Sequence, residues 1–594
     1  MRDGWGLLFL LTLSTSAALS AEPRYLNTDR GVKYVGSKTC AASGCHEKLS
    51  RDFAGTPMGN AMDRADRPEE LARVPKPVTV YNADFDRYFK VFRDGGNLFQ
   101  SEYQLDSAGK LVFEAKHRLA YVVGSGMNGF TYLVERDKHL FEAPLSYYSK
   151  TGQWDLSPGY VAADMGFSRP AHAGCLACHN GQPEAVPKRE ALYQDPPFRF
   201  GEVSIGCECC HGPGELHVRV RREANGKVQG LSIVNPAKLP PRLADDVCMN
   251  CHQGGHTRVL QPGKDYLDFR PGTPLNTVVA IFKLPLEKEQ REEADRAQLL
   301  PPVRGSVEMP SWWKNSSMEM SRCYQATNGQ LHCVTCHKIH RGPTAATRVS
   351  FYRERCLTCH TNTSCSLSLA ERLQQKPAND CSGCHMPKRP VAGIDHSSST
   401  NHRIMRRPGQ PLPDVAFELP KEVPGLIHVN ATDTSEPVPA LTRLAAYGEI
   451  MQKDPALKQH YLEILEELSR TQPDDPLVLA AMGRKALFER DYLGAVEYLS
   501  RALEKGSEAT TTFLDLGDAL SGAGRHEEAA QIFERGIAVS PYAQVLYKSL
   551  ALEFITMKQY PRAHQTIKRY VEIFPEDSFM RGLLDKIEAG RSAP

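Results

Sequence analysis

Cysteines followed directly by histidine carry the most specific chemical signal in this sequence. The chain has 17 cysteines and 20 histidines in 594 residues, a composition for which chance predicts roughly 0.02 CxxCH motifs. Six are present: Cys175-Cys178-His179, Cys207-Cys210-His211, Cys248-Cys251-His252, Cys333-Cys336-His337, Cys356-Cys359-His360 and Cys381-Cys384-His385. A seventh, Cys40-Ala-Ala-Ser-Gly-Cys45-His46, is longer by two residues. We number them in chain order, so that Cys40–His46 is motif 1 and Cys381–His385 is motif 7.

This order of residues fits the covalent attachment of haem c. Two thiols add across the two vinyl groups of one porphyrin, and the next residue, histidine, ligates the iron through a neutral imidazole nitrogen. A zinc site has no need of histidine at that position every time, and a thioredoxin-like redox pair would occur once. We therefore predict seven covalent haem c groups. Their predicted proximal iron ligands are His46, His179, His211, His252, His337, His360 and His385.

Three cysteines lie outside this pairing: Cys209, Cys323 and Cys365. Cys209 sits inside motif 3, between its two attachment cysteines. The sequence leaves two possibilities open for the three thiols. They are buried free thiols, or Cys323 and Cys365 form one disulfide and Cys209 is left over.

Enough further histidines are present to ligate every iron on its second face. The candidates closest to the motifs are His172, His217, His256, His340 and His402. His217 follows the turn Gly212-Pro213-Gly214, which points it away from the iron of its own motif and toward a neighbour. His340 follows His337 by three residues, on the same face if that segment is helical, and is also expected to serve a neighbour. Each candidate has the alternative of being an ordinary surface or core histidine, a reading that suits His117 and His139 better because they lie among predicted strands.

Three of these stretches resemble a known family. CHGPGxxH at His211–His217, CxxCHxxH at Cys333–His340 and CxxCHMPK at Cys381–Lys388 are similar to multihaem cytochromes related to the tetrahaem cytochrome of ammonia oxidisers. That group includes pentahaem nitrite reductases and octahaem hydroxylamine oxidoreductases. The resemblance covers roughly Cys40 to Arg407, and it implies that His217 ligates a different haem from that of motif 3.

The resemblance also singles out Met58. Relatives often carry S-x-H-x-x-A-M shortly after the first haem site, and this chain has Thr56-Pro57-Met58-Gly59-Asn60-Ala61-Met62. Met58 thus stands where the histidine of relatives stands, which implies that its thioether ligates the first iron and raises its potential relative to two histidines. Met62 competes for that role, and a core side chain is the alternative.

The predicted domains follow from composition along the chain. Residues 1–20 read as a signal peptide, with an apolar run from Leu7 to Leu13 and small residues before a cleavage near Ala21; the alternative is an N-terminal membrane anchor. The mature chain is then expected to be exported to the bacterial periplasm or beyond, and not to span a membrane. Residues 21–77 hold the first haem segment, 78–150 a β module, 151–402 haems 2–7, and 403–438 a proline-rich linker.

Two of these regions have a readable secondary structure. Residues 78–150 alternate as an antiparallel meander, with strands expected at 88–92, 98–105, 111–123, 130–134 and 140–148. Residues 439–590 repeat every 34 residues, as in Gly483, Gly517 and Ala551, or Ala495, Ala529 and Ala563. This period resembles the tetratricopeptide repeat (TPR), whose helix pairs stack into a solenoid with a concave groove. We expect a mixed fold: a haem-cored region with little regular structure, the β module, and an all-α TPR solenoid.

Three functions remain open at this point. The first is a multihaem electron-transfer protein that meets redox partner proteins and docks another protein in the TPR groove. The second is an oxidoreductase that acts on a small nitrogen or sulfur compound at one open haem, although the CxxCK site of pentahaem nitrite reductases is absent. The third is a scaffold in which the repeats do the main work. A formal charge of +2 gives no case for nucleic-acid binding.

Overall fold

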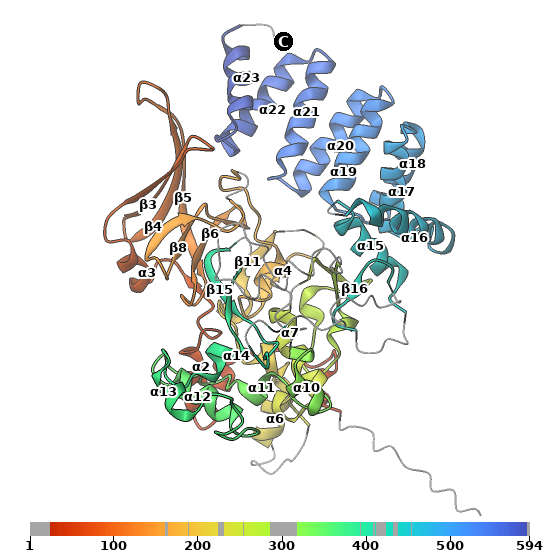
Figure 1. Cartoon of the computed structure of the whole chain (residues 1–594). Coiled ribbons are helices and arrows are strands. Elements are labelled where there is room, and N and C mark those ends of the chain that lie inside the picture. The colour runs from red at the N-terminus through yellow and green to blue at the C-terminus, as the bar shows by residue number, and fades with distance from the viewer. Residues whose placement is uncertain are drawn as a thin grey trace, which may run out of the picture.

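The structure is a computed structural model of the chain (Figure 1). It describes residues 24–160, 164–187, 189, 191–223, 231–253, 255–284, 318–391, 394–407, 410, 423–431, 437–452 and 454–590. The predicted signal peptide, residues 1–20, lies outside these ranges. Among the residues described, no helix is both long enough and apolar enough to cross a membrane.

An antiparallel sheet forms the side of the molecule that carries the predicted β module (Figure 1). Its strands run in the order β2-β3-β4-β5-β6-β8-β9, with β1 paired to β5 and β7 to β6. The strands are β1 (Met62–Arg64), β2 (Val78–Asn82), β3 (Arg87–Asp94), β4 (Asn97–Leu105), β5 (Leu111–Val123), β6 (Gly129–Arg136), β7 (His139–Glu142), β8 (Leu145–Tyr148) and β9 (Gln153–Leu156).

The meander predicted for residues 78–150 is thus confirmed, and the sheet extends beyond it by β1 and β9. The alternation that predicted it is visible in β3, where Phe89 and Val91 are fully buried and the residues between them are partly exposed. Together with Leu98, Tyr132 and Phe141 they form a continuous apolar cluster. The module therefore has a core of its own.

The segments with the Cys-His motifs fold into short helices, small ribbons and loops. Before the sheet lie η1 (Leu26–Thr28), α1 (Ser37–Cys40), α2 (Glu47–Ala54) and α3 (Pro68–Arg73). After it come α4 (Ala173–Leu176), β10 (Pro183–Ala185), β11 (Tyr193–Phe198), η2 (Arg199–Gly201), α5 (Glu208–His211), α6 (Glu215–Glu223), η3 (Pro236–Lys238), α7 (Pro241–His252), β12 (Thr257–Leu260), η4 (Tyr266–Asp268), η5 (Leu275–Thr277) and β13 (Val279–Lys283).

The remaining motif segments lie at the lower end of the molecule (Figure 1). Their elements are α10 (Arg322–Ala326), α11 (Cys333–Cys336), α12 (Arg348–Cys356), α13 (Leu369–Gln374), α14 (Cys381–His385), β14 (Lys388–Val391) and β15 (Ile394–Thr400). We call residues 318–388 the lower motif segment. None of its hydrophobic side chains is buried; its buried residues are Ser321, Arg372 and Asn379. These helices therefore have no apolar core made of protein.

The C-terminal region is a helical solenoid that extends across the top of the molecule (Figure 1). It comprises α15 (Ala440–Ile450), η7 (Pro455–Leu457), α16 (Lys458–Thr471), α17 (Pro476–Phe488), α18 (Tyr492–Glu504), α19 (Thr510–Gly522), α20 (His526–Val539), α21 (Gln544–Thr556), α22 (Tyr560–Ile573) and α23 (Ser578–Glu588).

The helices of the solenoid repeat with the predicted period. Helices α17, α19, α21 and α23 begin 34 residues apart, as do α18, α20 and α22. The small residues lie where paired helices touch: a Cβ added at Gly517 would overlap the ring of Phe533, and Ala495, Ala529 and Ala563 are buried. The predicted TPR-like solenoid is therefore present.

Both ends of the solenoid are attached to the rest of the molecule. At its start, Tyr447 and its neighbours share an apolar cluster with Val259 and Phe282 of the β12–β13 ribbon. At its end, Arg136 donates to the carbonyl oxygen of Ile573 at 3.0 Å, and Arg87 donates to that of Glu576 at 3.1 Å.

The structure differs from the predicted linker, residues 403–438, in the part that it describes. The strand β16 (Ile427–His428) pairs antiparallel with β13, and Leu426 is fully buried in the cluster shared with α15. The prolines of this range made it read as a spacer. Because a proline lacks only its own N–H, the residues between prolines remain free to pair, and here they do.

Candidate functional site

Each of the seven Cys-His motifs has at least one cysteine in a helix. In α7, α11 and α14 both cysteines of the motif are helical, so their spacing of three residues brings both thiols to one face. Motif 1 begins at the end of α1, motif 2 in α4, motif 3 at the start of α5 and motif 6 at the end of α12. The local fold thus presents each pair of thiols together.

Cysteines from different motifs lie against each other. The Cys40 thiol hydrogen-bonds to Cys207 and lowers the pKa of Cys207 to about 6. In the same way the Cys251 thiol lowers the pKa of Cys178 to about 7. A third contact joins motifs 4 and 5, where a hydrogen bond from the thiol of Cys333 lowers the pKa of the Cys248 thiol. Motifs 1 and 3, 2 and 4, and 4 and 5 are therefore direct neighbours.

Weaker electrostatic contacts connect the remaining motifs. Cys210 of motif 3 interacts with Cys248 of motif 4. Cys356 of motif 6 interacts both with Cys336 of motif 5 and with Cys381 of motif 7. The seven motifs therefore form one continuous series, 1–3–4–5–6–7, with motif 2 beside motif 4.

Three motif histidines each face a histidine from another segment. The ring centroids of His46 and His217 are 6.4 Å apart with an interplanar angle of 14°. Those of His211 and His340 are 5.9 Å apart at 9°. Those of His337 and His402 are 6.2 Å apart at 38°. In each pair one member belongs to a motif and the other was a sequence-predicted second ligand.

These separations fit one iron between the two rings. With metal–nitrogen bonds of about 2.0 Å and each ring centre roughly 1.1 Å behind its nitrogen, two imidazoles on opposite sides of one ion have centroids about 6.2 Å apart. Two stacked rings without an ion between them would approach to about 4.5 Å. The residues present therefore fit a haem iron held by two histidines.

Hydrogen bonds to Nδ1 orient several of these rings. The Nδ1 of His211 lies 2.8 Å from the carbonyl oxygen of Val234, and that of His402 lies 3.0 Å from the carbonyl oxygen of Thr400. His217 Nδ1 is 3.2 Å from the Ser232 hydroxyl. An Nδ1 engaged in this way leaves Nε2 for a metal, which is the usual arrangement of metal-ligating histidines.

Burial keeps these imidazoles in their neutral, ligating form. It lowers the pKa of His211, His217, His337 and His340. The sequence argument placed His340 on the helical face of His337 only if that segment were helical. It is not: α11 ends at Cys336, and His337 has extended backbone angles (φ −101°, ψ 133°). The extended chain is what carries His340 away to motif 3.

The other predicted ligands lie elsewhere. His172 precedes α4, and His256 accepts a hydrogen bond at Nδ1 from the backbone N–H of Leu284 at 2.9 Å. Met58 lies half-buried in the loop between α2 and β1, where its carbonyl oxygen accepts from the Ser204 hydroxyl at 3.3 Å. None of the three belongs to the histidine pairs above.

His117 and His139 are core residues of the β module. The ring of His117 packs on Phe167 with centroids 4.5 Å apart, and burial lowers its pKa to about 4. His139 is buried, with its Nδ1 2.9 Å from the carbonyl oxygen of Asp137. Their environment matches the alternative reading that the sequence left open for them.

All 17 cysteines are free thiols, so Cys323 and Cys365 form no disulfide in this structure. Cys209 is enclosed, with its thiol 3.1 Å from the carbonyl oxygen of Gly181, and burial raises its pKa to about 12. A thiol with so high a pKa is unreactive at neutral pH.

One positioning residue was missed by the sequence argument. Glu208, inside motif 3, is buried, and its carboxylate accepts from the backbone N–H groups of Gly36 at 2.7 Å and Gly214 at 2.6 Å. It therefore joins the segment before motif 1 to the turn that leads to His217. A charged residue between two attachment cysteines was the available signal.

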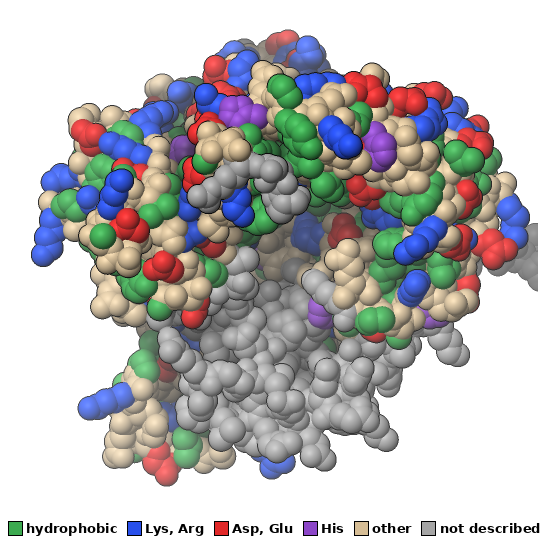
Figure 2. Space-filling view, turned by 90° about the horizontal axis from the view of Figure 1, so that it is seen from above, with side chains coloured by type: hydrophobic (Ala, Val, Ile, Leu, Met, Phe, Trp, Pro, Cys, Tyr) green, Lys and Arg blue, Asp and Glu red, His purple; other side chains and the backbone are tan. Residues whose placement is uncertain are grey.

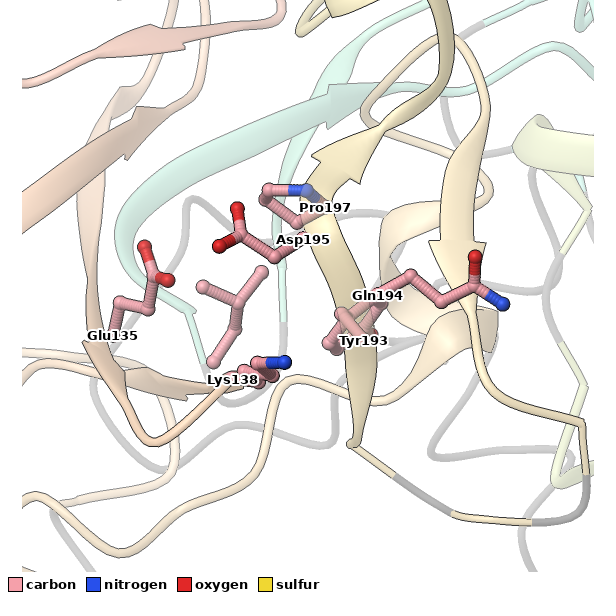
Figure 3. A pocket seen from close by; sticks show the side chains of 7 residues that line it. Glu135, Lys138, Tyr193, Gln194, Asp195 and Pro197 are labelled. Carbon is pink, nitrogen blue, oxygen red and sulfur yellow. The ribbon is translucent and has the colours of Figure 1, made fainter.

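A small pocket of about 190 Å³ lies apart from the motifs, between β6, β7 and β11 (Figure 3). Its lining includes Glu135, Lys138 and Asp195 but no motif cysteine or histidine. Among the described side chains, no group of three or more His, Cys, Asp or Glu is arranged to hold a metal ion. A haem iron needs only two protein ligands.

The comparisons with known proteins concern the solenoid. No family model and no curated protein matches the chain. Similar solved structures include MamA from Desulfovibrio magneticus RS-1 (20% identity, 25% of this chain, 85% of that chain, TM-score 0.22). Others are the Arabidopsis OM64 TPR domain (12%, 19%, 95%, 0.18) and the Cut9–Hcn1 complex (20%, 26%, 30%, 0.23). With TM-scores this low, the TPR-like assignment rests on the 34-residue helix period itself.

Proposed function

We propose that this chain is an exported multihaem c-type cytochrome that carries electrons between redox proteins through seven covalently attached haems. The observation that carries the proposal is the set of three histidine pairs, each with ring centroids 5.9 to 6.4 Å apart. Each pair joins a histidine that directly follows two thiols to one from a distant segment. That combination is what a haem c with two histidine ligands requires.

The lower motif segment supplies independent support. Residues 318–388 contain five helices but no buried hydrophobic side chain. Helices this short do not persist without packing. Porphyrins attached at motifs 5, 6 and 7 would supply the apolar surface that the protein lacks there.

The ligand assignment follows from the pairs. His46 and His217 would hold the first iron, His211 and His340 the third, and His337 and His402 the fifth. The first assignment replaces Met58, for which the resemblance implied that iron. His172, His256 and Met58 are then candidates for the irons of motifs 2, 4, 6 and 7.

Haem c supplies one-electron redox chemistry when bound. The chain's own contribution is to fix the order of the sites. Contacts between cysteines hold motif 1 against motif 3 and motif 4 against motif 5. Because these contacts are made by the attachment residues themselves, the spacing of neighbouring sites cannot drift. The solenoid adds a surface for docking a protein partner.

A redox titration of the holoprotein followed by EPR tests the proposal. We expect seven one-electron steps and low-spin ferric signals from histidine-ligated iron. The competing function, reduction or oxidation of a small nitrogen or sulfur compound, requires an open iron. A high-spin signal that disappears when nitrite or sulfite is added, with turnover, would establish that function instead.

A further inference from the structure

Charge is distributed unevenly between the two ends of the molecule. From the start of α10 to Lys388 the sequence has nine Lys and Arg against three Asp and Glu, a formal charge of +6. Residues 439–590, the solenoid, have 18 against 23, a formal charge of −5. The two regions lie at opposite ends of the molecule (Figure 1). The formal charge of +2 for the whole chain conceals this polarity.

The basic side chains of the lower end are exposed and available. We call the following five the basic rim: Arg322, Lys338, Arg341, Lys376 and Lys388, all of them exposed. None of them forms an ion pair with another residue that the structure describes. Lys338 makes only a cation–π contact, with its Nζ 5.7 Å from the ring centre of Phe351.

The solenoid treats its charges differently. Arg484 pairs with Asp515 at 2.7 Å, and Arg501 pairs with Asp474 at 2.8 Å. Seen from above, basic and acidic side chains are interspersed over the upper face (Figure 2). Opposite charges that neutralise each other locally produce little long-range field, whereas the unpaired rim attracts anionic partners.

An exposed apolar patch belongs to the same segment. Leu367, Leu369 and Leu373 are 40%, 44% and 56% exposed. Leu369 and Leu373 are four residues apart in α13 and so share one face. Exposed apolar side chains in a polar and charged surrounding are typical of protein interaction sites.

The attachment residues of motifs 6 and 7 also reach the surface here. Cys359, His360 and Cys384 are exposed. Under the proposed function, the last two redox sites of the series would therefore lie beside the rim and the leucines. A protein bound at this surface would be close to them.

We propose that the lower end of the molecule, with Leu367, Leu369 and Leu373 surrounded by the basic rim, is the docking surface for an acidic redox protein. The inference rests on the proposed function for the exchange of electrons, but the binding itself needs only the surface. Steering by an unpaired charge of one sign raises association rates by about 10- to 1000-fold at low salt.

The probe is an acidic flavodoxin, mixed with the holoprotein in a stopped-flow instrument and in a calorimeter. We expect binding and electron exchange that both weaken steeply between low and physiological ionic strength. The double variant Arg322→Glu/Lys376→Glu, at two rim positions outside every motif, should lower the low-salt rate constant about tenfold or more. It should remove most of the salt dependence and weaken binding in the calorimeter.

The matched control is Arg535→Glu/Lys568→Glu, which makes the same change of charge at exposed positions of the solenoid. It should leave the rate constant and its salt dependence unchanged. Equal effects of the two double variants would overturn the proposal, because they would show a response to net charge alone.

Three other results would also overturn the proposal. The rim could serve only as counter-charge for haem propionates, in which case the variant shifts midpoint potentials but leaves flavodoxin binding intact. It could bind the acidic solenoid of a second copy, in which case the variant abolishes self-association in sedimentation and again spares flavodoxin. Salt-independent binding would exclude steering. A protein without haem would refute the proposed function, while the calorimetric comparison of the two variants would still decide the docking surface.

Discussion

The solenoid and the lower motif segment are both helical, yet only one of them contains its own core. In the solenoid, helices of 11 to 14 residues bury Phe533, Leu546 and Phe554 in a continuous cluster. In residues 318–388 the helices have four to nine residues, and no hydrophobic side chain is buried. The difference teaches that the second region depends on a non-protein core, while the first is specified by its own repeats.

The largest effect should follow from removing one attachment site in the region without a core. In Cys356→Ser/Cys359→Ser we expect the loss of one haem and rapid proteolysis within residues 348–388, because nothing else there excludes water. Limited proteolysis followed by mass spectrometry measures both. Cys365→Ser, a spare cysteine of the same segment, is the control and should keep every haem. Equal protease resistance of the double variant and the native protein would contradict the comparison.

In the solenoid, the corresponding change is the loss of a core aromatic ring. Phe533 is fully buried against Gly517. Phe533→Ala should therefore lower the free energy of unfolding of the solenoid by about 3–5 kcal/mol, through lost burial and the cavity that remains. Denaturant unfolding followed by circular dichroism measures this. The haem content should not change; a loss of haem in this variant would mean that the solenoid and the motif region fold as one unit.

A smaller and more local effect is expected from the histidine pairs. His217→Ala should open one iron, which becomes high-spin in EPR and binds added cyanide, while all seven attachments remain. Met58→Ala is the matched control, because the pairing of His46 with His217 leaves Met58 without a role at the first iron. The opposite outcome, a high-spin iron in Met58→Ala and an unchanged His217→Ala, would restore the ligand that the resemblance implied.

The smallest effect concerns the contact between the solenoid and the β module. Burial raises the pKa of Glu576 to about 7, with Asp164 and Asp577 adding to the rise and Arg136 opposing it. Its folded-state pKa therefore exceeds its unfolded value, so folding stability is present at low pH and falls as pH rises from about 4.5 to 7. Glu576→Gln should flatten this part of the pH–stability profile. An unchanged slope in that variant would assign it to another group, such as Glu102.

The elements with a regular pattern were predictable from sequence. The two-residue alternation gave the β module, and the spacing of Gly483, Gly517 and Ala551 gave the helix pairs, because each pattern follows directly from burial in a repeating geometry. The packing of β16 in the proline-rich range was not predictable, since it depends on a partner strand more than a hundred residues away.

The same limit applies to the candidate site. CxxCH spacing is local, so the seven motifs could be found by inspection. The pairing of His211 with His340 joins residues 129 positions apart and needs the extended chain after His337. The role of Glu208 was also beyond reach, because its partners Gly36 and Gly214 come from two other segments. Neither contact leaves a pattern in the sequence around it.

The intact mass of the protein, produced in a host with a cytochrome c maturation system, tests the central claim most directly. Seven covalent haems add about 4.3 kDa to the polypeptide. We predict this increment together with a pyridine haemochrome spectrum typical of thioether-linked haem. A loss of one haem from this total would point to motif 1, whose cysteines are the most widely spaced. A mass equal to that of the polypeptide alone, with no haemochrome signal, would contradict the account.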